Sequence, residues 1–116
     1  MALLTAITPL VTGAVSAGAA VSASDTIDQG TLGGNGVLLE IINGNASADT
    51  VTISDYGTTP AGNALTSNQI SKSVAGTTNQ VFVIRPSQVN PATGLVTITH
   101  STTATVTYKM YNLAGF

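Results

Sequence analysis

The side chains suited to chemistry are few in this chain, and His100 is the first to consider. It is the only histidine, and the chain contains no cysteine. One imidazole without thiolates or a neighbouring group of carboxylates does not make a recognisable zinc or non-haem iron site. A Ser-His-Asp triad is assembled in space, but the Gly-x-Ser-x-Gly turn around a nucleophile is missing. We therefore interpret His100 as a polar residue beside a turn, and we expect no enzyme.

The carboxylates are spaced too widely to predict a metal site. Asp25 and Asp28 are three residues apart, which supplies too few oxygen ligands for a calcium loop. Asp49 and Asp55 are isolated in the sequence. These residues predict neither a bound metal nor a cofactor.

Two further stretches look like functional motifs and have simpler explanations. Glu40 lies inside the apolar run 37–42, where a catalytic acid would need a proton-transfer partner beside it. An ion pair with Arg85 or Lys109, at an interface or a sheet edge, is the commoner role. The glycine cluster 30–36 lacks the terminal Gly-Lys-Ser/Thr of a phosphate loop, so we expect a turn there.

The charge balance argues against nucleic acid and membrane as partners. The formal net charge is −2, with only three basic residues, so no positive field gathers phosphates or anionic lipids. The apolar stretch at the N-terminus is too short and too interrupted for a bilayer, which takes about 20 apolar residues.

The surface composition favours contact with other proteins. Charged residues make up 7% of the chain, whereas an ordinary soluble domain has about 25%. Serine and threonine fill the polar positions instead, and such a surface requires little desolvation of ions when another protein covers it. The alternative is a rigid, threonine-rich β domain of viral or extracellular type that is simply neutral outside. Composition leaves both readings open.

Period-two alternation of apolar and polar residues predicts an all-β chain. The 116 residues suffice for one domain, and no helix is expected in the sandwich. We predict an antiparallel β-sandwich of jelly-roll type with about seven or eight strands. The expected strands lie at 19–27, 37–42, 50–54, 70–74, 81–84, 94–100 and 105–111.

The C-terminal pair of strands carries the clearest pattern. Apolar residues occupy even positions in both 94–100 and 105–111, so a hairpin between them must pair even with even. A two-residue turn would place Ile98 opposite Thr107, which puts an apolar residue against a polar one. We therefore expect a hairpin with a loop of three or five residues.

The segments outside these strands suggest an interface. We divide the chain into an N-terminal arm, 1–17, and a sandwich domain, 18–116, and we expect the arm to dock on a neighbouring chain. The alternatives are that it folds back on its own sandwich, or that 1–23 is a signal peptide without the usual positive residue. The irregular segment 55–68 is long enough to contact a partner. The predicted interface residues are Leu3, Leu4, Ile7, Leu10, Val11, Tyr111 and Phe116.

With the strands placed, the chain resembles the small β-sandwich head decoration proteins, or capsid cement proteins, of tailed bacteriophages, particularly those infecting actinobacteria. Five stretches carry the resemblance and cover most of residues 18–110: AAVSASDT (19–26), LEIING (39–44), TVTI (50–53), SVAGT (73–77) and GLVTITHS (94–101). The family tends to have Val-Pro-Ala-Gly at the fourth stretch, and the proline between valine and alanine is missing here. The tail 111–116 runs beyond the usual last strand.

The resemblance implies a structural protein without enzymatic activity. Such a protein is made in the host cytoplasm, binds the outer surface of an assembled virion and bridges subunits of the major capsid protein, often as a homotrimer. Two alternatives remain at this point. One is another virion β protein, of the tail or a head fibre, and the other is a secreted bacterial adhesion or carbohydrate-binding module.

Overall fold

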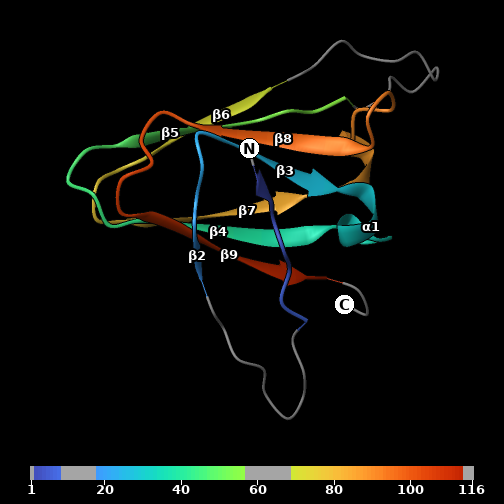
Figure 1. Ribbon diagram of the computed structural model, residues 1–116, viewed down its shortest axis with the longest axis horizontal. Coiled ribbons are helices and arrows are strands. Elements are labelled where there is room, and N and C mark those ends of the chain that lie inside the picture. Colours follow the sequence, from blue (N-terminus) through green and yellow to red (C-terminus); the bar gives the residue numbers. More distant parts are fainter. Residues whose placement is uncertain (1, 9–17, 57–68, 114–116) are drawn as a thin grey trace.

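The chain folds as a β-sandwich, as predicted from its alternating strands (Figure 1). The structure is a computed structural model that describes residues 2–8, 18–56 and 69–113. Within these residues two sheets face each other across one apolar core. Almost all strand pairs are antiparallel, and the exception is β1, which runs parallel to β3.

The two sheets have different strand orders. The five-stranded sheet has the order β1-β3-β8-β5-β6, and the four-stranded sheet has the order β2-β9-β4-β7. The bounds are β1 Ala2–Leu3, β2 Ala19–Ala20, β3 Ser24–Asp28, β4 Val37–Asn43, β5 Asp49–Ile53, β6 Ile70–Val74, β7 Asn79–Ile84, β8 Leu95–His100 and β9 Val106–Asn112. A one-turn helix α1, Gln29–Leu32, and a 3-10 turn, Pro86–Gln88, complete the described elements.

The central strand β4 shows why these residues form a sandwich. Its odd-numbered residues are buried, and its even-numbered residues are partly exposed. Val37, Leu39 and Ile41 are fully buried between the sheets, where they contribute apolar area to the core. The nearly continuous apolar run 37–42 predicts a strand covered on both faces. That prediction is wrong, because only the inner face is fully covered.

The predicted C-terminal hairpin is wrong, although both of its strands exist. β8 pairs with β3 and β5, while β9 pairs with β2 and β4, so the two strands belong to opposite sheets. The loop 101–105 crosses between the sheets. Burial of the even positions in both strands is confirmed. Alternation identifies the buried face of a strand but not the sheet to which it belongs, and for this reason the hairpin was inferred incorrectly.

The N-terminal half contains two further departures from expectation. The expected strand 19–27 divides into β2 and β3, which lie in different sheets, and residues 21–23 cross between them. The glycine-rich segment begins with α1, where a turn alone was expected. Leu32 at the end of α1 is buried, and it closes that end of the core.

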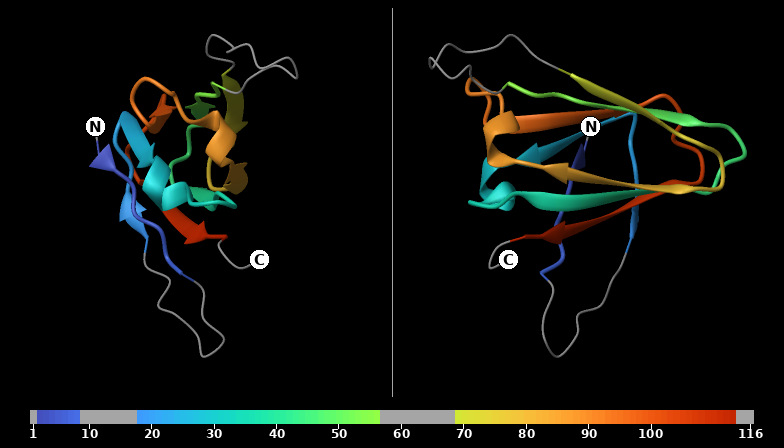
Figure 2. Two further views of the ribbon diagram at one scale, coloured as in Figure 1. Left: turned by 90° about the vertical axis from the view of Figure 1, so that its right-hand side faces the viewer. Right: turned by 180° about the vertical axis from the view of Figure 1, so that it is seen from behind.

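Residues 2–8 of the predicted arm lie along this chain's own sandwich. β1 extends the five-stranded sheet beside β3, and Ile7 bridges to Tyr111 of β9 in the other sheet. The segment therefore closes one side of the sandwich (Figure 2). Leu4 is 3% exposed and belongs to the core, and its amide donates to the Thr26 carbonyl oxygen at 2.9 Å. The fold-back alternative describes residues 2–8, whereas residues 9–17 lie outside the described residues.

A leucine pair tests whether residues 2–8 stabilise the domain. Leu4→Ala removes a core side chain and should lower the free energy of unfolding by about 2–5 kcal/mol. Leu3→Ala is the matched control, because Leu3 is 57% exposed and its truncation should change stability by less than about 0.5 kcal/mol. Urea unfolding followed by circular dichroism measures both. Equal effects would show that the segment does not pack in this way.

Candidate protein-binding face

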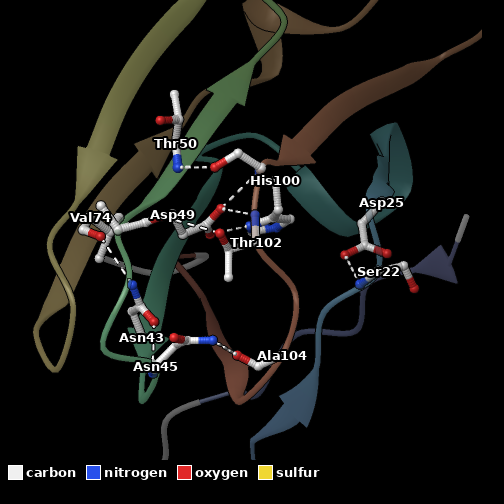
Figure 3. Close-up of polar contacts among 12 residues, drawn as sticks. Ser22, Asp25, Asn43, Asn45, Asp49, Thr50, Val74, His100, Thr102 and Ala104 are labelled. Atoms are coloured by element: carbon white, nitrogen blue, oxygen red, sulfur yellow. Dashed lines mark hydrogen bonds and ion pairs between the residues drawn. The ribbon is translucent and has the colours of Figure 1, made fainter.

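His100, the side chain best suited to catalysis or metal binding, is part of a buried pair. Its Nδ1 lies 2.7 Å from Oδ2 of Asp49, and the two side chains are 1% and 0% exposed (Figure 3). The other Asp49 oxygen, Oδ1, accepts hydrogen bonds from the amides of Ser101 and Thr102 at 3.0 and 3.1 Å. The pair thus joins β5 to the end of β8 and holds the start of the crossing loop.

Sequence reasoning missed this pair. Asp49 was interpreted as isolated and His100 as a residue beside a turn. The two residues are 51 positions apart, and they meet only because β5 and β8 are neighbours in one sheet. An ionised carboxylate only accepts hydrogen bonds, so in that state the imidazole Nδ1 carries the hydrogen. A pair this deeply buried stabilises structure and is not accessible to a substrate.

A second buried polar group ties the two sheets together at the same end of the molecule. The Asn43 side chain, at the end of β4, donates to the carbonyl oxygens of Ser47 and Val74 at 2.9 and 3.1 Å. Its Oδ1 accepts from the amide of Asn45 at 2.9 Å, and the Asn45 side chain reaches the Ala104 carbonyl oxygen at 3.1 Å (Figure 3). These contacts fix the loops at this end of the sandwich.

The described part of the chain lacks three kinds of site. Its residues enclose no ligand-sized cavity. Residues 2–8, 18–56 and 69–113 contain no group of three or more histidine or carboxylate side chains that could hold a metal ion. The same residues include no helix with the length and apolar character needed to cross a membrane.

The outer face of the four-stranded sheet is the feature that favours a function. Side chains of β4 alternate between the core and the outside, and register partners project from the same face of a sheet. The even-numbered residues of β4 therefore share the outer face with their partners on β7 and β9. We call this surface the outer face and define it by Leu38, Glu40, Ile42, Asn79, Val81, Val83, Thr107, Lys109 and Tyr111.

Most side chains of the outer face are apolar. Val81 and Val83 of β7 are 52% and 48% exposed, which is unusual for large apolar side chains in consecutive outward positions of a strand. Leu38 of β4 is directly paired with Val83 on one side and with Tyr111 on the other. Ile7 bridges to Tyr111, so an apolar row runs across the whole sheet.

β7 also forms an edge of this sheet. It pairs with β4 on one side, and no strand among the described residues pairs with its other side. Proteins usually protect such an edge with lysine, proline or a bulge. The stretch Asn79–Ile84 contains neither a charged residue nor a proline. The edge and the outer face together form a surface without net charge, which is suited to another protein chain.

The structure distributes the predicted interface residues over three environments. Leu4 is buried in the core, and Leu3 is exposed on β1. Tyr111 belongs to the outer face, and Ile7 bridges to it at the end of the apolar row. Leu10, Val11, Phe116 and the loop residues 57–68 lie outside the described residues.

Of the two partners considered for Glu40, Lys109 lies directly opposite it. The register pairs Glu40 with Lys109 on β9 and with Val81 on β7. Sequence reasoning missed the valines of β7 as interface residues. Their alternation with Phe82 and Ile84 was visible, but it does not show which face of the strand remains uncovered.

Comparison with protein-family models, with curated proteins and with solved structures found no significant match to this chain.

Proposed function

We propose that this chain is a structural virion protein that binds the outer surface of a phage capsid and stabilises it by bridging subunits of the major capsid protein. The family resemblance of the sequence suggests this role, and the proposal assigns the chain no reaction and no cofactor. Synthesis takes place in the host cytoplasm, and the working location is the virion.

The observation that carries the proposal is the exposed apolar surface on the outer face. Val81 and Val83 project from an unprotected edge strand, next to the partly covered Leu38. Covering such side chains removes apolar area from water at about 25 cal/mol per Å², while few ions lose their hydration. In a particle the outer face is covered by a protein chain, and its hydrocarbon then stabilises the assembly.

A shell also explains how modest contacts suffice. A protein present in many copies on a closed lattice is held by several neighbours at once, so the separate contacts add through multivalency. The neutral, threonine-rich surface fits this arrangement, because closely spaced copies of a strongly charged protein would repel one another.

A pair of double variants tests the proposal. Val81→Lys with Val83→Lys places two charges on the outer face and should reduce occupancy on purified particles at least tenfold. The matched control is Ser71→Lys with Ser73→Lys. These serines are exposed on the edge strand β6 and project from the outer side of the other sheet, so the control adds the same charge elsewhere.

Occupancy is measured by co-sedimentation of each variant with particles that lack the natural protein. Thermal unfolding should be similar for the two double variants, since both alter exposed edge positions. Full occupancy by the valine variant would refute the role of the outer face. Failure of the wild-type chain to bind any particle would refute the capsid assignment, and specific binding to a polysaccharide would favour the secreted module instead.

A further inference from the structure

The centre of the outer face carries one acid and one base. Glu40 on β4 lies directly opposite Lys109 on β9. The aliphatic part of Lys109 lies near Gly18, at the other side of β9, so its stem adds hydrocarbon to the surface. All other residues that define the outer face are uncharged. The face is therefore neutral, with its two opposite charges in neighbouring strands.

This arrangement is self-complementary. A two-fold axis parallel to the strands, running between β4 and β9 in the plane of contact, exchanges the two members of every β4–β9 register pair. Glu40 of one copy then meets Lys109 of the second copy, and Lys109 of the first meets Glu40 of the second. A two-fold contact uses the same patch on both subunits, so self-complementarity is its essential requirement.

The apolar row obeys the same operation. Leu38 and Tyr111 are register partners, so Leu38 of one copy faces Tyr111 of the other copy across the axis. Val83 and Ile7 lie at opposite ends of the row, one strand beyond β4 and β9 respectively, so Val83 of one copy faces Ile7 of the other. The hydrocarbon at both ends of the row is thus covered together with the central charges.

We propose that a second copy of this chain covers the outer face, with the β4–β9 boundary on a two-fold axis. This inference rests on the proposed function in one respect, namely that a protein chain covers the outer face. It identifies that protein chain as a second copy of this one. The lysine substitutions at Val81 and Val83 would then lower occupancy on particles by breaking this pair, because each copy loses a neighbour that helps to hold it there. A two-fold pair also differs from the trimer that the family resemblance implies.

The size of the face sets the strength of the contact. The three long strands β7, β4 and β9, about 4.8 Å apart and with at least six residues each at about 3.4 Å, outline roughly 300 Å². A standard interface buries about 800 Å² on each partner. The pair is therefore expected to dissociate on dilution, and many copies held close together on a particle would keep it formed.

Charge reversal tests the contact on the purified full chain, without particles. Glu40→Lys alone and Lys109→Glu alone each place like charges against each other across the axis, so each variant should associate at least tenfold more weakly than the wild type. A 1:1 mixture of the two variants restores opposite charges at both contacts. The mixture should therefore form a heterodimer that neither variant forms alone, as measured by sedimentation velocity over a range of concentrations.

The mixture also shows whether a folding defect causes the weaker association of the single variants. Within each variant the register neighbours carry like charge, both alone and in the mixture, so any loss of stability is the same in the two samples. The proposal is overturned if the mixture remains monomeric. It is also overturned if the wild-type chain remains monomeric at about 1 mM, because even a millimolar Kd gives substantial dimer at that concentration. Either result leaves particle binding by the wild-type chain to be judged separately, so the two proposals fail independently.

Discussion

Replacing Asp49 with alanine is expected to lower the free energy of unfolding by about 2–6 kcal/mol, because two donors lose their acceptor at about 1–3 kcal/mol each. The carboxylate is fully buried and contacts His100 and two backbone amides of the crossing loop. Its removal leaves the Thr102 amide and the imidazole without this partner, whereas the Ser101 amide keeps its hydrogen bond to the Thr50 carbonyl oxygen at 3.2 Å. Donors that lose their partner away from water cost more than the original bonds contributed.

Asp28→Ala is the control for this substitution. Asp28 is an exposed carboxylate at the end of β3, and its loss should change stability by less than about 0.5 kcal/mol. His100→Ala should also destabilise strongly, because it leaves the Asp49 carboxylate buried without its imidazole partner. Urea unfolding measures the three variants. If Asp49→Ala behaved like Asp28→Ala, the pair would not anchor the crossing loop.

The second large effect is expected at Gly76. A Cβ at this position would lie 2.2 Å from the carbonyl oxygen and 2.5 Å from the carbonyl carbon of Ala46. Those are backbone atoms, so the 75–78 turn or the loop around Ala46 must move to admit a methyl group. Gly76→Ala should therefore cost about 3 kcal/mol or more, at the upper end of overpacking effects.

Gly34→Ala provides the matched control, since a Cβ there meets nothing within 4 Å. Its effect should stay within about 0.5 kcal/mol. The same calorimetric or urea experiment on both variants separates close backbone approach from the general effect of replacing glycine. A Gly76→Ala protein as stable as the wild type would show that the two loops are not in contact.

The alternation of residues in single strands was enough to predict the sandwich. β5, β8 and β9 each bury one set of alternate residues, as expected from the pattern in the sequence. A buried face forms wherever apolar residues recur with period two, whatever the neighbouring strand is. This local property is the reason that the fold class was predictable from sequence.

Sheet membership was not predictable in the same way, because it depends on contacts between distant residues. β8 and β9 follow each other closely in sequence and still belong to opposite sheets. The Asp49–His100 pair depends on the same long-range pairing. For the interface, Ile7 and Tyr111 were expected, whereas Val81 and Val83 were recognisable only once β7 was located at an uncovered edge.

Sedimentation of the natural protein tests most directly whether this chain works by lying against other proteins in a virion. A clarified lysate from cells that produce the chain at its natural level is separated on a density gradient, and the chain is located by mass spectrometry. We expect it in megadalton particles, together with a larger coat protein present in many copies. Recovery of the chain only as a monomer or dimer, with the coat protein in separate fractions, would contradict the account.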